Sequence, residues 1–213
     1  MLFCSKCEVK ACYKDYKGDK DSMPMGCPSK NEEVLEKAKA LYFDEENMKI
    51  AHNAALVEAG GYGRKTRLEE TIDFMNKCGY KKIGLAFCYG LRSEAKTLTK
   101  ILEYHGFEVH SVMCKCGAVP KKHIGIKPEE TVHNNPDEIM CNPIGQAIFL
   151  NEEKVDFTLL FGLCVGHDTL CLKYLDSPVS VFAVKDRVLA HNPVAAIYQS
   201  EAYYKSKIYN KEK

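Results

Sequence analysis

Residues 81–90 read KKIGLAFCYG, and this stretch decides the fold class. Its centre, residues 82–87, is a short apolar run of the length typical of a buried strand. Cys88 follows the run directly, and the amphipathic pattern of residues 91–105 predicts a helix that ends at Gly106. A buried strand followed by an amphipathic helix is typical of proteins in which helices connect parallel strands.

The same alternation continues along the chain. Strands are predicted at residues 107–113, 157–163 and 179–184, with helices at 143–153 and 169–175. This order predicts an α/β fold: a mainly parallel, Rossmann-like sheet of at least four strands with helices on both faces. The predicted strands end near Phe87, Met113, Leu163 and Val184.

Helices are also predicted upstream of the sheet, at residues 32–43, 47–59 and 66–77. The last of these opens with Thr66 and Glu69 in the spacing of a capping box. We therefore expect a helical segment, residues 32–79, that packs on a main α/β domain formed by residues 80–213.

Residues 1–31 form a separate cysteine-rich segment with few apolar side chains, so they cannot build a hydrophobic core alone. Their cysteines have the spacing C-x2-C-x4-C-x14-C and are Cys4, Cys7, Cys12 and Cys27. Four thiolates can hold one zinc ion or a 4Fe–4S cluster, and spacing alone does not choose between them. We predict a small metal-binding module here; the alternative is four unrelated cysteines in a flexible tail.

A second group of cysteines falls where predicted strands end. Cys88, Cys114 and Cys164 each follow a strand, and Cys141 comes just before the helix predicted to start at Pro143. The carboxyl ends of parallel strands share one edge of the sheet, where ligands bind. We therefore expect these four thiols to converge on a second metal ion or iron–sulfur cluster. Cys78 and Cys171 fall inside predicted elements and are assigned to packing, and Cys116 is left outside the group.

Polar residues accompany these cysteines. Cys164, His167 and Asp168 lie within five residues and are candidate catalytic groups, although His167 could be an ordinary loop histidine and Asp168 a helix cap. The run Lys185-Asp186-Arg187 follows the last strand and could hold a small anionic or sulfur-containing ligand. Its alternative is a solvated charge cluster.

The composition limits the compartment and the partners. The formal net charge is +1, so nothing suggests a nucleic-acid partner, and no stretch of 18 uncharged apolar residues suggests a membrane. No secretory signal is recognised, so a cytoplasmic location is expected. Eleven cysteines, an odd number, then favour metal ligation or thiol chemistry over disulfides.

Several motifs resemble the domain of unknown function 1847 family, whose members are described as uncharacterised metal-binding proteins. They are CSKCEVKAC (4–12), TRLEE (66–70), GLAFCYGLRSEA (84–95), CNPIGQA (141–147), GLCVGHD (162–168) and KDRVLAHNP (185–193). The resemblance extends over almost the whole chain. It implies metal binding, with both cysteine groups falling in family motifs, and it implies no particular reaction.

Three functions agree with these observations. The first is a metal-binding protein whose second cysteine cluster serves an iron–sulfur-dependent sulfur-handling or redox enzyme. The second is a non-enzymatic metal or redox sensor. The third is a thiol enzyme with a nucleophilic cysteine and only a structural zinc. The sequence does not fix the oligomeric state.

Overall fold

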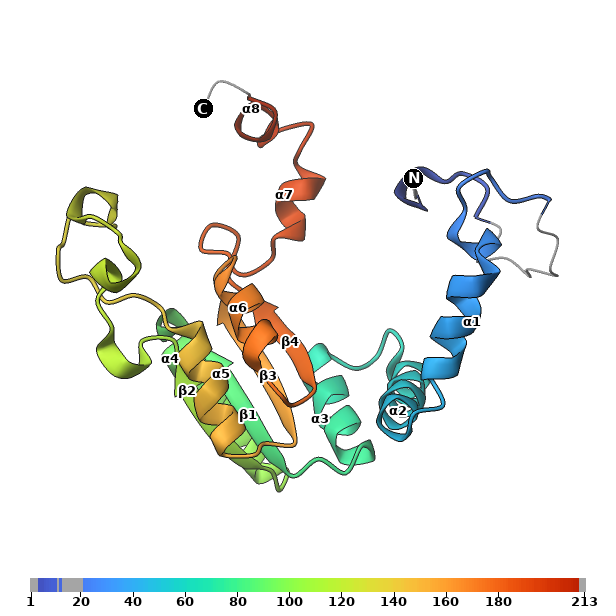
Figure 1. Cartoon of the computed structure of the whole chain (residues 1–213), viewed down its shortest axis with the longest axis horizontal. Helices are drawn as coiled ribbons and strands as arrows, with labels where there is room; N and C mark the ends of the chain where they lie inside the picture. The colour runs from blue at the N-terminus through green and yellow to red at the C-terminus, as the bar shows by residue number, and fades with distance from the viewer. Residues whose placement is uncertain (1–3, 11, 13–20, 211–213) are drawn as a thin grey trace. The chain divides into compact units, whose positions relative to one another are not determined.

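The computed structural model describes residues 4–10, 12 and 21–210 (Figure 1). The chain divides into two compact units, residues 1–60 and 61–213. The division falls inside the segment 32–79, because the third helix of that segment packs with the sheet. Part of the cysteine-rich segment 1–31 lies outside the described residues.

The first unit contains little buried apolar surface. It consists of two 3-10 turns, η1 (Cys4–Lys6) and η2 (Pro28–Lys30), followed by the helices α1 (Glu32–Leu41) and α2 (Glu45–Gly61). The Asn31 side chain caps α1 by accepting a hydrogen bond from the Val34 amide at 3.1 Å. None of the residues of α1 is buried. The helices therefore form where the sequence predicted them, but the described part of this unit has no large core.

The second unit is built on a four-stranded sheet in which all neighbouring strands are parallel. The strands are β1 (Lys82–Phe87), β2 (Glu108–Met113), β3 (Phe157–Leu163) and β4 (Val179–Val184), in the order β2-β1-β3-β4. This confirms the predicted α/β fold class and the four predicted strand ends. The central strand β3 is buried along its whole length, as its apolar sequence requires.

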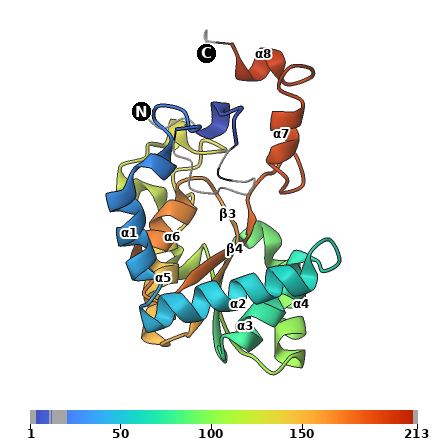
Figure 2. The ribbon, with the colours of Figure 1, turned by 90° about the vertical axis from the view of Figure 1, so that its right-hand side faces the viewer.

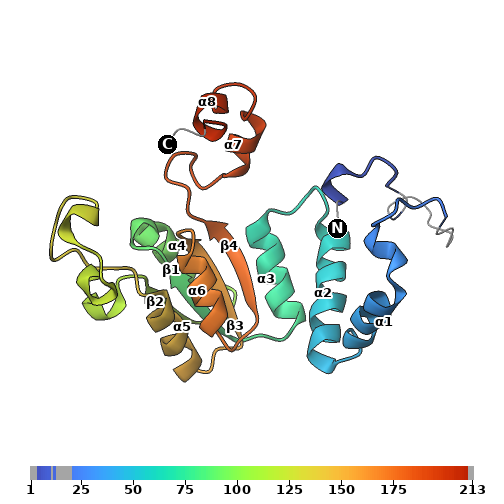
Figure 3. The same cartoon turned by 45° about the horizontal axis from the view of Figure 1, so that its top comes forward.

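Helices cover both faces of this sheet (Figure 3). On one face, α3 (Arg67–Lys77) and α4 (Arg92–Tyr104) share a core with Ile83, Leu85 and Leu159. On the other, α5 (Pro143–Glu152) and α6 (His167–Tyr174) share a core with Ala86 and Leu160. Successive strand residues point to opposite faces, which is why two cores form from the same strands.

Local signals in the sequence account for several of these elements. Thr66 and Glu69 form the predicted capping box at the start of α3. Cys78 and Cys171 are buried, one in each core, which confirms that both serve packing.

Long loops leave the carboxyl ends of the strands. The segment after β2 contains three 3-10 turns, η4 (Cys116–Ala118), η5 (Lys121–Ile124) and η6 (Pro128–Glu130). After β4, the chain continues beyond the sheet into the short helices α7 (Val194–Tyr198) and α8 (Lys205–Ile208) (Figure 2). Among the described residues, no helix has the length and apolar character needed to cross a membrane.

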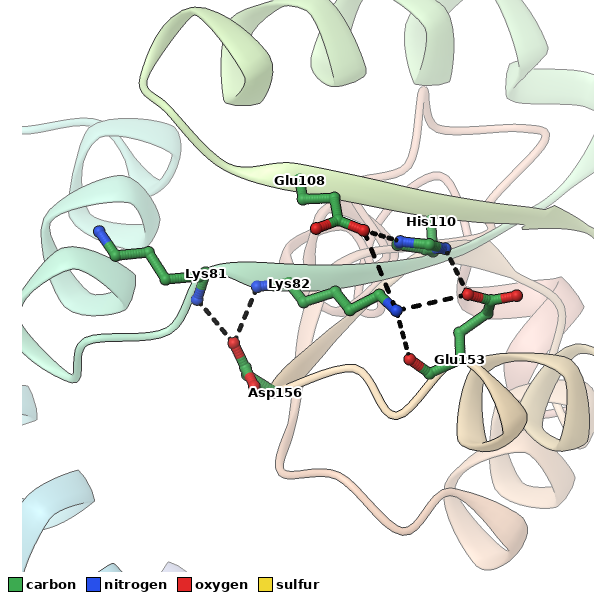
Figure 4. Close-up of polar contacts among 6 residues, drawn as sticks. All are labelled: Lys81, Lys82, Glu108, His110, Glu153 and Asp156. Carbon is green, nitrogen blue, oxygen red and sulfur yellow. Dashed lines mark hydrogen bonds and ion pairs between the residues drawn. The ribbon is translucent and has the colours of Figure 1, made fainter.

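The amino ends of the strands are tied together by charged groups (Figure 4). His110 lies between two carboxylates, 2.6 Å from Glu108 and 3.1 Å from Glu153. The Lys82 ammonium is 3.4 Å from the Glu153 carboxylate and donates to the Glu153 carbonyl at 2.6 Å. Asp156 accepts hydrogen bonds from the backbone amides of Lys81 and Lys82 at 2.7 and 2.8 Å. These contacts join β1, β2 and the start of β3.

Replacing Asp156 by alanine is expected to lower the free energy of unfolding by about 1–2 kcal/mol, because two charge-assisted hydrogen bonds at an exposed site are lost. Asp156→Asn keeps one acceptor oxygen and should lose less. Urea unfolding followed by circular dichroism measures both changes. An alanine variant as stable as the wild type would show that Asp156 does not tie the strands.

Candidate functional site

The first residues beyond the strands are held in place by backbone hydrogen bonds that continue the sheet. The Cys88 amide donates to the Phe161 carbonyl at 3.1 Å, and the Cys114 amide donates to the Phe87 carbonyl at 2.9 Å. The Asn142 amide donates to the Cys114 carbonyl at 2.7 Å, which brings the Cys141 segment beside the end of β2. The cysteines are therefore positioned by the sheet itself rather than by free loops.

Asn142 and Pro143 set the helix that follows Cys141. The Asn142 side chain caps α5 by accepting from the Gly145 amide at 2.9 Å, and Pro143 occupies the first turn as predicted. Because α5 starts at this edge, its amino end lies next to Cys141, where it favours negative charge.

Gln146, in the first turns of α5, is a contributor that the sequence analysis missed. Its side chain is fully buried, and its amide nitrogen donates to the carbonyls of Phe87 at 3.1 Å and Val112 at 2.7 Å. It thus joins Phe87, the last residue of β1, to Val112, the residue before the last in β2. A glutamine in an otherwise apolar helix face was the available signal.

The four predicted cysteines line one cavity. Cys88, Cys114, Cys141 and Cys164 surround a space of about 480 Å³. The other residues that line it are Tyr89, Gly90, Lys115, Lys185, Asp186, Arg187, Ala190 and His191. All eleven cysteines of the chain are free thiols. The structure therefore brings together the residues that the sequence analysis grouped, and adds basic side chains to them.

The cavity lies at the point where the connections of the sheet diverge. From β1 the chain passes to β2 on one side, whereas β3 lies on the other side of β1. Cys88 follows β1 and Cys164 follows β3, so these two thiols flank that point. In open parallel sheets, ligands bind outside the carboxyl ends of the strands at this position.

The thiols of Cys88, Cys114 and Cys141 shift one another's pKa values. The hydrogen bond to Cys114, together with burial, raises the pKa of Cys88 to about 12. The hydrogen bond to Cys141 raises the pKa of Cys114, and the hydrogen bond from Cys114 lowers the pKa of Cys141 to about 7. Negative charge therefore gathers on Cys141, with the positive charge of Lys115 as a further cause.

Two more donors point at sulfur atoms. The Tyr89 amide donates to Cys114 Sγ at 3.3 Å, and Arg187 Nη2 donates to Cys164 Sγ at 3.0 Å. The contact with Cys164 raises the pKa of the Arg187 guanidinium. Lys115 Nζ donates to the Ile139 carbonyl. Positive charge therefore lies close to Cys164 and Cys141, whereas the pKa values of the Cys88 and Cys114 thiols are raised.

His167 and Asp168, two of the three candidate catalytic residues, are not among the residues that line the cavity. His167 is half-buried at the start of α6, and burial lowers its pKa. Asp168 Oδ1 accepts from the amide of Thr169 at 2.8 Å, a local contact within the first turn of the helix. Of the three, only Cys164 lines the cavity, and the catalytic roles stay predictions.

The N-terminal cysteines line a separate cavity in the first unit. Cys4, Cys7, Cys12 and Cys27 surround about 360 Å³ together with Lys6, Glu8, Lys10, Pro24, Gly26 and Pro28. The Cys7 amide donates to the Cys4 carbonyl at 3.2 Å, which closes the turn between the first pair. The structure thus also brings this predicted group to one place.

Neither group has the arrangement of a single bound ion. In the part of the chain that the structure describes, no three His, Cys, Asp or Glu side chains are placed so that they could hold a metal ion. The sulfurs of a zinc tetrathiolate lie about 3.5–4 Å apart, whereas an iron–sulfur cluster places its ligands on separate irons and farther apart.

Comparison with known proteins agrees with the motifs. The chain matches the family described as "Protein of unknown function (DUF1847)" over residues 27–182. This range includes Cys27 and the four cysteines at the carboxyl edge, or rim, of the sheet, the rim cysteines Cys88, Cys114, Cys141 and Cys164. An uncharacterized protein of Methanocaldococcus jannaschii, MJ0455, is 46% identical over 207 residues, which cover 96% of this chain and 97% of that protein. No solved structure matches. The chain therefore belongs to the family of proteins of unknown function DUF1847.

Proposed function

We propose that Cys88, Cys114, Cys141 and Cys164 bind an iron–sulfur cluster in the cavity at the carboxyl edge of the sheet, and that the protein is a redox or sulfur-handling protein. Cys4, Cys7, Cys12 and Cys27 are proposed to bind zinc or a second cluster. The observation that carries the proposal is the convergence of four thiols, from four separate segments, on one cavity at the divergence point of the sheet.

The size of the cavity supports a cluster rather than a single ion. A volume of about 480 Å³ greatly exceeds that of one zinc ion with its sulfurs in contact. A cluster occupies more of it and accepts ligands that are spread over a wider area.

The surrounding donors support the same conclusion. Four thiolates carry four negative charges, and the irons offset only part of them, so a cluster site needs nearby positive charge. Lys115, Lys185 and Arg187 line the cavity and supply it. The amide of Tyr89 and the guanidinium of Arg187 donate to cysteine sulfurs, and hydrogen bonds of this kind tune the reduction potential of a bound cluster. A bound cluster would supply one-electron transfer.

The test is anaerobic purification followed by absorbance spectroscopy and analysis of iron, sulfide and zinc. The wild-type protein is expected to absorb near about 400 nm and to contain about four irons per rim cluster. Cys88→Ser and Cys141→Ser should each remove most of the iron assigned to the rim. Cys116→Ser is the matched control, because Cys116 is two residues from Cys114 and does not line the cavity.

A colourless protein that contains zinc alone would contradict the cluster. It would favour the third hypothesis, a thiol enzyme with a structural zinc, in which Cys164 beside Arg187 is the nucleophile. Equal iron loss in the Cys116 variant and the rim variants would show that the iron is not held by the rim cysteines.

A further inference from the structure

We propose that Lys185 and Arg187 form a binding site for a small divalent anion beside the rim cysteines. The inference deepens the proposed function, because the anion would occupy the same cavity as the cluster. It assigns a ligand class, small oxyanions and their sulfur analogues, to these two side chains.

The first reason is that these two cations lack carboxylate partners. Among the described residues, ion pairs join lysines and histidines elsewhere to carboxylates, but none involves Lys185 or Arg187. The nearest carboxylate in sequence, Asp186, accepts from the backbone amides of Val188 and Leu189 at 2.9 and 2.8 Å. The Asp186 carboxylate is therefore engaged with the loop backbone rather than with Lys185 or Arg187.

The second reason is that hydrogen bonds hold the loop that carries the two cations. The Lys185 amide donates to the Leu163 carbonyl at 3.0 Å, which ties the start of the loop to β3. His191 closes the loop twice, since its amide donates to the Asp186 carbonyl at 3.0 Å and its Nδ1 accepts from the Asp186 amide at 3.1 Å. A loop that is already ordered pays little entropy when a ligand binds.

The third reason is the space that two glycines leave for the Lys185 ammonium. A side-chain carbon added at Gly90 would lie 3.5 Å from Lys185 Nζ and 3.9 Å from Cys88 Sγ. One added at Gly162 would lie 3.8 Å from the same ammonium group. Lys185 Nζ therefore reaches the cavity next to Cys88, from where it can contact an anion beside the thiols.

Arg187 is the second cation of the site and lies beside Cys164. A guanidinium group has five N–H donors, and one of those of Arg187 is bonded to Cys164 Sγ, so others can bind a ligand. Guanidinium groups bind oxyanions through paired hydrogen bonds, whereas an ammonium group acts as a compact charge. Together, the Arg187 guanidinium and the Lys185 ammonium suit an anion that carries at least two negatively charged oxygen or sulfur atoms.

Isothermal titration calorimetry of the full chain with thiosulfate, in low-salt buffer, tests the inference. Wild-type protein is expected to give saturable heat, and Lys185→Gln and Arg187→Gln should each weaken binding by about tenfold or more, since each removes a charge-assisted contact. Lys96→Gln, an exposed charge on α4, is the matched control and should bind like the wild type. Arg187→Lys should recover part of the affinity.

The same titration with sulfate shows whether the site binds oxyanions in general or recognises the sulfur atom of thiosulfate. Equal affinity for both anions identifies a general oxyanion site, and tighter thiosulfate binding identifies recognition of sulfur; both support the inference. No saturable heat with either anion, or equal losses in the Lys96 and Arg187 variants, overturns it. Iron analysis of the same samples keeps the two proposals apart: anion binding without iron contradicts only the cluster, and iron without anion binding contradicts only this inference.

Discussion

Replacing Cys4 and Cys7 together by serine is expected to remove one equivalent of zinc, or one cluster, from the protein and to leave residues 1–31 open to proteolysis. The reason is that the described part of that segment contains few buried apolar side chains, Met23 being one. None of the described residues of η1 or η2 is buried, and Cys4 and Cys12 are exposed, so bound metal would supply most of the free energy that orders the segment. Metal analysis and limited proteolysis measure the two effects.

The control for this change is Ser5→Ala, which alters the same 3-10 turn without removing a thiol. It should keep the metal and the protease resistance. The unit formed by residues 61–213 should stay folded in the double variant, because the described residues of its two cores all come from within that unit. Unchanged metal content in the double variant would show that these cysteines are not ligands.

Gly162→Ala is expected to lower the free energy of unfolding of the second unit by about 2–5 kcal/mol, from the cost of a left-handed backbone and of overpacking. Gly162 has φ +68° inside β3, at an irregularity in the pairing with β4. A methyl group there would overlap with Leu91 Cδ1. Such a loss is a large part of the stability of a typical domain.

Urea unfolding followed by circular dichroism measures this loss, with Gly90→Ala as the matched control. Gly90 also borders the cavity, but an added carbon there makes only ordinary contacts, the nearest at 3.5 Å from Lys185 Nζ. The control should differ from the wild type by less than about 1 kcal/mol. If Gly162→Ala unfolds no more easily than Gly90→Ala, neither the left-handed backbone at Gly162 nor its closeness to Leu91 restricts the side chain at this position.

The strands could be predicted because a strand that is buried on both faces appears in the sequence as a run of consecutive apolar residues. β1, β3 and β4 have the bounds that their apolar runs indicated, and the capping box at Thr66 marks the start of α3. The helix ends were predicted less closely: the helix expected at residues 169–175 is observed at His167–Tyr174. Its start follows Gly166, whose φ of +82° sets the turn. The pattern of apolar residues does not predict this backbone conformation.

The candidate site was predictable in part for a similar reason. A cysteine that directly follows a strand of a parallel sheet must lie at the carboxyl edge, whatever the order of the strands, so Cys88, Cys114 and Cys164 could be placed there from the sequence. Gln146 was missed because its role depends on two carbonyls, those of Phe87 and Val112, that come together only when β1 and β2 pair.

The sequence by itself determined the fold class, the strand ends and the edge at which the rim cysteines lie, because these follow from local patterns of apolar residues and from the geometry common to parallel sheets. Only the tertiary structure decided the strand order β2-β1-β3-β4, which places Cys88 and Cys164 on either side of the divergence point. It also decided that Arg187 meets Cys164, 23 residues away, at 3.0 Å. Contacts of this kind depend on how distant segments pack, and no local pattern encodes that packing.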